Sequence, residues 1–165
     1  MRLRKTTRNR KVDVMLKKFF AAILVVSLLM IESTALAAYP KYLGGDRNYI
    51  LFDGHMGGAR YLVRNSVQVV GDDSYAIVLS ADWVAVGDAD RGGTKISGRY
   101  NCRFGYQWSK GKAFNITSGK WNPVNPNMSR AAGGAFAGAA EIAFYLASNG
   151  KKFFGTYSDS FYPDL

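Results

Sequence analysis

Hydrophobic and polar positions alternate most regularly between Thr94 and Trp108, where the sequence reads TKISGRYNCRFGYQW. A period of two kept over this length predicts a β-strand with one buried face and one wet face. The predicted buried set is Ile96, Gly98, Tyr100, Cys102, Phe104, Tyr106 and Trp108. The predicted wet set is Lys95, Ser97, Arg99, Asn101, Arg103 and Gln107.

Shorter apolar runs on either side of this segment predict further strands. They read RNYILFD, ARYLVR and SVQVV at residues 47–53, 59–64 and 66–70, and KAFNITS at residues 112–118. The run from Ser74 to Val86 is apolar on both faces, as in a strand at the centre of a sheet. The tripeptide Ser109-Lys110-Gly111 suits a hairpin connection from the long strand to the run that follows it.

One helix is predicted near the C-terminus, in the stretch GAAEIAFYLASNG at residues 138–150. Ile142, Tyr145 and Leu146 have helical spacing, and Asn149-Gly150 is a typical C-terminal stop. The preceding stretch AAGGAFAG is too rich in glycine to be assigned. The whole pattern predicts a mainly β or α+β fold, with an antiparallel sheet of five to seven strands and one short C-terminal helix packed on it.

The first 37 residues have the order of a secretory signal peptide. Lys17 and Lys18 precede an apolar run at residues 19–30, and Ala35-Leu36-Ala37 forms a small-x-small cleavage signal. The apolar run is shorter than the ~20 residues needed to cross a bilayer, so no transmembrane anchor is expected in the mature chain. Met15 begins an ordinary signal peptide by itself, so we expect it to be the true start, with residues 1–14 as an upstream extension.

The formal net charge of +10 at first suggests a nucleic-acid partner. Residues 1–37, however, hold eight of the 22 Lys and Arg residues and two of the 12 Asp and Glu residues. The remainder carries 14 basic and 10 acidic residues, a net charge of +4, which is ordinary for a soluble domain. Residues 38–165 are therefore predicted to be a single β-rich domain that is exported to the periplasm or the medium and does not bind nucleic acid.

The only histidine of the chain, His55, lies in the glycine-rich stretch DGHMGG between two predicted strands. Asp-Gly and Gly-Gly pairs supply the positive φ angles that a hairpin connection requires. A catalytic histidine would need a nucleophile and an orienting group, and only Asp53 is near in sequence. We therefore predict a turn here and no catalytic role for His55.

The other candidates for chemistry are few. The single cysteine, Cys102, falls in the buried set, so a small buried hydrophobic residue is favoured over a reactive or intermolecular thiol. One Cys and one His are too few for a usual zinc site. The loop GDADRGG at residues 87–93 resembles a calcium loop, but Arg99 stands where the bidentate Glu belongs. No catalytic, cofactor-binding or metal-binding residue is assigned, and the chain is not expected to be an enzyme.

Four residues form a possible binding surface. Lys95, Arg99 and Arg103 are four residues apart on the wet face of the long strand, a spacing of ~13 Å at ~3.3 Å per residue. Such a basic row could bind an anionic polymer, a lipid headgroup or an acidic protein, although a solubilising face that protects the sheet is the simpler explanation. Trp121 precedes a rigid proline loop and is more simply explained as a cap on the core than as a ligand contact.

Three segments carry a resemblance to known proteins: YILFDGHMGGARYLVRNSVQVV, FGYQWSKGKAFNITSGKWNPVNP and AAEIAFYLASNGKKFFGTY. They resemble a group of small exported bacterial proteins and are similar to the surface-adhesin protein E-like family. The shared features are Tyr61, Arg64, Ser66 and Val67 before a sheet, then a lysine-containing hairpin, a Trp and a helix rich in Ala, Phe and Tyr. The adhesin-like resemblance implies a surface-exposed sheet that binds a host protein. The chain lacks the lipid-bearing cysteine and the disulfide of that family, so no binding residue is carried over.

These observations predict a secreted or periplasmic, non-enzymatic domain that binds an envelope or extracellular protein or an anionic polymer, and that uses no cofactor. The main alternative is a cell-wall or glycan hydrolase whose carboxylates are not recognised in the sequence, in which Glu141 is the only glutamate after residue 37. Alanine at His55, Asp53 and Glu141 would test that alternative. A structural accessory of an envelope complex is the third possibility.

Overall fold

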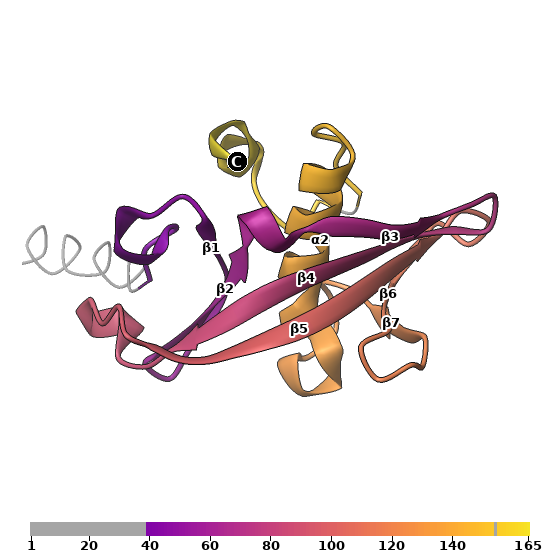
Figure 1. Ribbon diagram of the computed structural model, residues 1–165. Coiled ribbons are helices and arrows are strands. Elements are labelled where there is room, and N and C mark those ends of the chain that lie inside the picture. The colour runs from indigo at the N-terminus through magenta and orange to yellow at the C-terminus, as the bar shows by residue number, and fades with distance from the viewer. Residues whose placement is uncertain (1–38, 154) are drawn as a thin grey trace, which may run out of the picture. The chain divides into compact units, whose positions relative to one another are not determined.

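A computed structural model of the chain describes residues 39–153 and 155–165, which belong to one compact unit. The predicted signal peptide at residues 1–37 and the predicted start at Met15 lie outside the described residues. The strands are β1 (Tyr49–His55), β2 (Gly58–Val63), β3 (Gln68–Asp72), β4 (Ala76–Val86), β5 (Ile96–Gln107), β6 (Lys112–Asn115) and β7 (Asn122–Val124), followed by the helix α2 (Ala135–Ala147). The predicted fold class is confirmed: an antiparallel sheet with one C-terminal helix packed on it (Figure 1).

The sheet is built around β4, the central strand that the two-sided apolar pattern predicted. The strand order is β1-β2-β4-β5-β6-β7, and β3 pairs with the same long strand β4. Because β2 pairs with residues Trp83–Val86 and β3 with residues Ile77–Ser80, both occupy one edge of β4, one after the other. Ser66 lies at the break between them, where its Oγ donates to Val63 O at 2.6 Å and accepts from Asp82 N at 2.7 Å. At this break the two bonds to Ser66 Oγ take the place of main-chain hydrogen bonds between β4 and a neighbouring strand.

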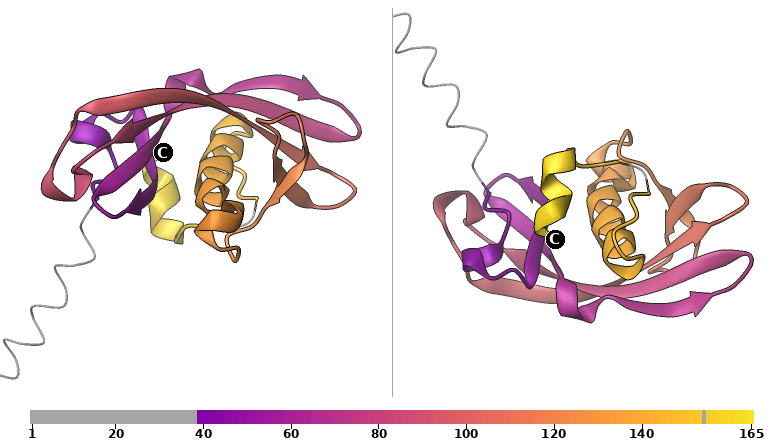
Figure 2. Two further views of the ribbon diagram at one scale, coloured as in Figure 1. Left: turned by 90° about the horizontal axis from the view of Figure 1, so that it is seen from below. Right: turned by 90° about the horizontal axis from the view of Figure 1, so that it is seen from above.

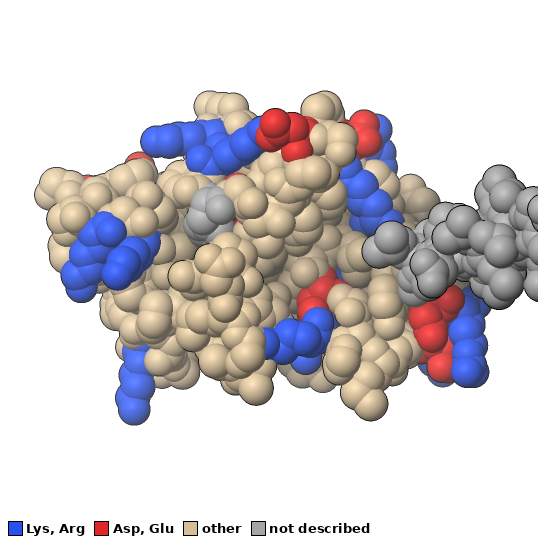
Figure 3. All heavy atoms as spheres, turned by 180° about the vertical axis from the view of Figure 1, so that it is seen from behind, with Lys and Arg blue, Asp and Glu red and all other residues tan. Residues whose placement is uncertain are grey.

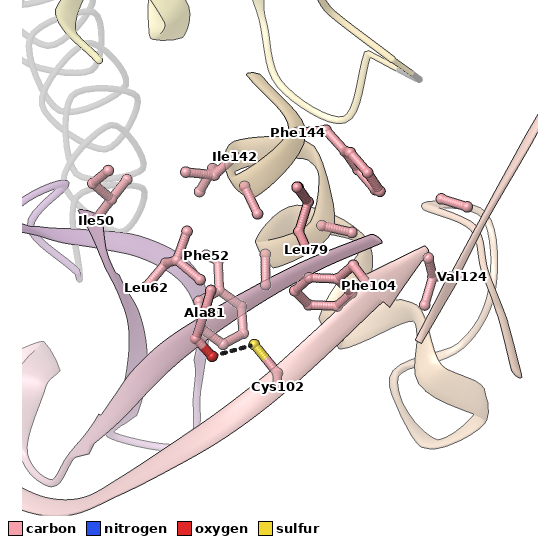
Figure 4. Close-up of a cluster of buried hydrophobic side chains, with 14 of the residues drawn as sticks. Ile50, Phe52, Leu62, Leu79, Ala81, Cys102, Phe104, Val124, Ile142 and Phe144 are labelled. Atoms are coloured by element: carbon pink, nitrogen blue, oxygen red, sulfur yellow. Dashed lines mark hydrogen bonds between the residues drawn. The ribbon is translucent and has the colours of Figure 1, made fainter. Parts of the chain in front are cut away.

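The main core fills the concave face of the sheet, which curves around α2 (Figure 2). Apolar side chains from the strands meet the small-residue face of the helix, where three alanines and Gly138 let the helix approach closely. Buried residues of this core include Ile50, Leu62, Leu79, Phe104, Ile142 and Phe144 (Figure 4). Burial of this kind is the dominant stabilising term in folding.

A second, smaller core lies on the opposite face at the β1–β2 end of the sheet. Alternation along β2 turns Leu62 into the main core and Tyr61 and Val63 into the second one. The short 3₁₀ turns Leu43–Gly45 and Ala89–Arg91 each contribute a buried residue to it. Its buried members are Leu43, Ala59, Tyr61, Val63, Val84, Val86 and Ala89.

The predicted turn at His55 is confirmed. His55 is the last residue of β1 and pairs with Gly58, so Met56 and Gly57 form a two-residue hairpin loop. Both loop residues have positive φ, 49° and 81°, which is the conformation that the right-handed strand twist requires. The connection after β5 is likewise a hairpin, because Gln107 pairs with Lys112 across it.

The burial predicted for the long strand β5 is correct at its middle and fails at both ends. Cys102 and Phe104 are buried as expected, but Ile96, Tyr100 and Trp108 are 41%, 51% and 40% exposed, respectively. Gln107, assigned to the wet face, is buried at 3% and donates from Nε2 to Tyr75 Oη. The alternation is real, but the exposed apolar side chains lie beyond the area that α2 covers.

Basic side chains from other parts of the domain donate hydrogen bonds to main-chain carbonyl groups of the C-terminal segment. A 3₁₀ helix (Asp159–Asp164) closes the fold, and its carbonyl end faces cations from the start of the domain. Lys41 Nζ donates to Phe161 O and Arg64 donates to Leu165 O, both at 2.6 Å. Positive charge at a helix carbonyl end satisfies carbonyl groups that have no partner within the helix.

Candidate functional site

A groove with a volume of about 640 Å³ opens beside β5, between that strand, β7 and the segment that leads into α2. It exists because β6 pairs with β5 only as far as Phe104. The last links are Ile116 N to Arg103 O at 2.8 Å and Arg103 N to Thr117 Oγ1 at 2.9 Å. In the described part of the chain no strand pairs with the earlier part of β5 on the side away from β4. The lining comprises Trp83, Tyr100, Asn101, Cys102, Asn115, Thr117, Ser118, Asn122, Pro123, Val124, Ala131, Ala132, Gly133 and Phe136.

One wall of the groove is aromatic. Trp83 and Tyr100 are register partners on β4 and β5, and their rings stack with centroids 4.5 Å apart and planes 24° apart. Phe136, in the first turn of α2, packs edge-on against Trp83 at 6.1 Å. Trp83 and Phe136 are half-buried, whereas Tyr100 is 51% exposed. The result is an aromatic surface that begins in the core and ends in solvent.

Gly98 leaves room for the Tyr100 ring. A Cβ atom at residue 98 would come within 2.6 Å of Tyr100 Oη, so the phenol end of the tyrosine extends over the glycine two residues earlier on the same face. The absence of a side chain at residue 98 therefore permits this position of the ring.

The opposite wall of the groove is polar and uncharged. Its side chains are Asn115, Thr117, Ser118 and Asn122, from β6, β7 and the loop between them. Asn115 Oδ1 accepts from Thr117 N at 2.9 Å, and Asn122 Nδ2 donates to Ser118 Oγ at 3.3 Å. These bonds orient amides and hydroxyls that keep further donor and acceptor positions for a ligand. The lining holds no Asp, Glu, Lys or Arg.

A charged cluster lies next to the aromatic wall. The Asp53 carboxylate accepts bonds from both terminal nitrogens of Arg130, and Arg60 approaches it at 3.7 Å. The Arg60 guanidinium also lies over the Trp83 ring, 5.4 Å from its centroid. The Asp53 side chain is 7% exposed, whereas Arg60 and Arg130 are 38% and 42% exposed. The cluster is therefore an ion triad with a nearly buried carboxylate, and it joins β1, β2 and the start of the helical segment.

Cys102 lies at the floor of the groove and is 1% exposed. Its Sγ donates to Ala81 O at 3.2 Å across the β4–β5 ladder (Figure 4). Burial, and then the negative charge of Asp82, raise the pKa of the Cys102 thiol to about 12. The thiol is therefore protonated at neutral pH, as the prediction of a buried hydrophobic residue required.

The predicted binding surface is divided by the structure. Lys95 precedes β5 and is separated from Arg99 by a bulge at residue 97, so strict alternation does not relate the two. Arg99 forms an ion pair with Asp82 at 3.0 Å on the neighbouring strand. Figure 3 shows the molecule from behind the view of Figure 1, and on that face the Lys and Arg side chains stand in separate groups.

Trp121 lies close to Arg103 on the convex face. It covers Gly105, two residues along β5 from Arg103, where a Cβ atom would collide with the indole ring. Its ring packs edge-on against Phe114 at 5.4 Å and Tyr75 at 6.2 Å. Trp121 is thus a partial cover over the sheet, 38% exposed, as well as an accessible aromatic side chain.

The residues considered for hydrolysis occupy different environments. His55 is exposed at the hairpin, and the Asp53 carboxylate is engaged by arginines. Glu141 is fully buried in α2, where it accepts from Tyr162 Oη at 2.9 Å and from Phe153 N at 3.2 Å. These partners give both carboxylates a structural role. Within residues 39–153 and 155–165, no group of three His, Cys, Asp or Glu residues is arranged to hold a metal ion.

Sequence reasoning missed the groove. Tyr100 was assigned to the buried face, and Trp83 was only one residue of an apolar strand. The alternation carried no signal for the groove, because Tyr100 and Cys102 belong to the same predicted face and only Tyr100 is exposed.

Comparisons with protein-family models, curated proteins and solved structures give no match to this chain. The resemblance to the surface-adhesin protein E-like family therefore stays a prediction. None of the helices in the described part is long and apolar enough to span a bilayer.

Proposed function

We propose that this protein is an exported, non-enzymatic binding domain that holds an envelope or extracellular component in the groove beside β5. One observation carries the proposal: Tyr100 is half in solvent, yet its ring is held against Trp83 and over Gly98. A large aromatic side chain fixed in place and open to solvent loses little entropy on binding. Such residues contribute a large share of the energy at binding sites.

The test replaces Tyr100 and measures retention on isolated envelope material or secreted polymer. We expect Tyr100→Ala to weaken retention tenfold or more, equivalent to about 1.4 kcal/mol. Val69→Ala is the control, because Val69 is an apolar side chain of similar exposure, 50%, on β3 and outside the lining of the groove. Equal retention of the Tyr100→Ala variant and the native protein would remove the groove from consideration.

The convex surface around Arg103 and Trp121 is a second candidate, for an anionic polymer. Support comes from the proximity of a cation and a partly exposed indole on one face, next to Tyr75. Arg103→Ala and Trp121→Ala should then reduce retention on an anionic polymer, and 0.5 M salt should abolish it, because exposed charges are screened within ~8 Å already at physiological ionic strength. Retention insensitive to salt and to both changes would exclude this surface.

A further inference from the structure

We infer that the groove beside β5 takes an uncharged saccharide chain. This inference rests on the proposed function and names the ligand class of the same site. It follows from the chemistry of the two walls, from the absence of ionic groups among the lining residues, and from the shape of the opening.

The aromatic wall matches the apolar face of a sugar ring. One face of a pyranose presents C–H groups of small positive partial charge, whereas the face of an aromatic ring is negative. Tyr100 is 51% exposed and stacks on Trp83 with the ring planes 24° apart, so it offers a flat ring face rather than a deep apolar pocket. A flat aromatic face can stack against a sugar ring over its whole area. It makes few contacts with a branched aliphatic side chain.

The polar wall matches sugar hydroxyls. Each hydroxyl of a sugar is both a donor and an acceptor, and so are the amide and hydroxyl groups of Asn115, Thr117, Ser118 and Asn122. A carboxylate or phosphate ligand would find no lysine or arginine in the lining, and a cationic one no carboxylate. The volume of about 640 Å³ lies within the range of small-ligand sites, and the groove is open to solvent along its length.

An extended polypeptide paired to the free edge of β5 is the competing occupant. Arg103 directs its N–H and C=O away from β4, so alternation gives Asn101 and Arg99 the same direction. Strand addition depends on a row of such main-chain bonds. Here the row ends after these two residues, because the bulge at Ser97 interrupts it. The edge is too short to be the main source of affinity, which favours the saccharide.

The experiment uses Trp83 as a reporter. Trp108→Phe and Trp121→Phe leave Trp83 as the only tryptophan of the protein, directly beneath Tyr100. The protein is titrated with soluble neutral oligosaccharides, including tetramers of β-1,4 N-acetylglucosamine, β-1,4 glucose and α-1,4 glucose. Tetragalacturonate and a capped Thr-Val-Thr-Val-Thr peptide serve as the charged and strand-forming probes. If the double replacement does not fold, side-chain amide NMR shifts of Asn115 and Asn122 in the native protein replace the fluorescence.

We expect at least one neutral saccharide to bind saturably, with affinity at least tenfold lower in Tyr100→Ala, unchanged in Val69→Ala and insensitive to salt. Absence of binding across the neutral set, or preference for the charged probe or the peptide, overturns the saccharide assignment. Exhaustive proteinase K digestion of the envelope material separates the two levels. Retention that needs Tyr100 but is lost after digestion refutes the saccharide and leaves the proposed function, whereas retention that ignores Tyr100 refutes both.

Discussion

At the residue scale, Gly98 and Tyr100 show how a missing side chain can create a surface. The glycine weakens the strand slightly, since glycine loses more conformational freedom on folding than other residues. In return, the space above it accommodates the phenol end of the tyrosine, which a Cβ atom at residue 98 would displace.

Gly98→Ala tests this relation. The added methyl group would displace the phenol end of Tyr100, a flexible group, so we expect the free energy of unfolding to change by less than about 1 kcal/mol. Ligand retention should nevertheless fall as far as it does in Tyr100→Ala. Urea unfolding and the retention assay measure the two effects, and unchanged retention would show that the ring orientation is unimportant.

The ion triad allows a second prediction at this scale. Arg130→Met leaves the nearly buried Asp53 carboxylate with Arg60, at 3.7 Å, as its remaining cation. We expect a loss of about 2–3 kcal/mol in unfolding free energy, below the full cost of breaking a buried pair because Arg130 is 42% exposed. Arg99→Met, in the more exposed pair with Asp82, should cost less than about 1 kcal/mol. Similar costs for the two variants in urea unfolding would contradict the structural role of the triad.

At the element scale, the contact between α2 and the C-terminal segment depends on a buried carboxylate. Glu141 is the only fully buried charged residue in the part of the chain that the structure describes, and it accepts bonds from Tyr162 and Phe153. A helix that is otherwise apolar on this side thereby holds a segment that has little regular structure of its own.

Tyr162→Phe removes one donor to this carboxylate and keeps the ring. We expect a loss of about 2 kcal/mol, typical of a hydrogen bond to a charged group in a buried site. Tyr145→Phe is the control, because Tyr145 packs on the Tyr162 ring at 4.9 Å and is not the donor to Glu141. Chemical denaturation of both variants measures the difference, and equal stabilities would show that the Tyr162 hydroxyl contributes nothing.

Element boundaries show where sequence reasoning succeeds. The strands around β4 and the stop at Asn149-Gly150, where both residues have positive φ, follow from local pattern and are found as predicted. β7 was missed because Pro123 argues against a strand, although proline is tolerated at the sheet edge that β7 forms. The start of α2 was left unassigned because Gly133 and Gly134 interrupt the helical pattern before it.

At the scale of the whole molecule, burial of weak acids determines the response to alkali. Burial raises the pKa of the Cys102 thiol from 9.0 to about 12, and burial together with the Glu141 carboxylate raises that of Tyr162 from 10.0 to about 12. Burial also raises the pKa of Tyr61 and Tyr157. In each case the unfolded chain releases its proton at a lower pH than the folded protein does.

The free energy of unfolding should therefore fall as pH rises through the range from about 9 to 12. In that range the unfolded state binds fewer protons than the folded state, which makes the slope of stability against pH negative. Below the ordinary pKa values these groups leave stability unchanged with pH. Urea midpoints at pH 7, 9 and 10.5 measure the effect, and the Cys102→Ala variant should show a shallower decline. A flat profile in the native protein would contradict it.

The sequence by itself determined every strand except β7, the hairpins, the end of the C-terminal helix and the burial of Cys102, because alternation and turn residues act over a few neighbouring positions. Tertiary structure alone decided which apolar side chains remain exposed. Tyr100 and Cys102 are two residues apart on the same strand face, yet one is 51% exposed and the other 1%. Their difference depends on how far a helix and a short strand, distant in sequence, extend over β5. The alternation along a strand holds no information about that coverage.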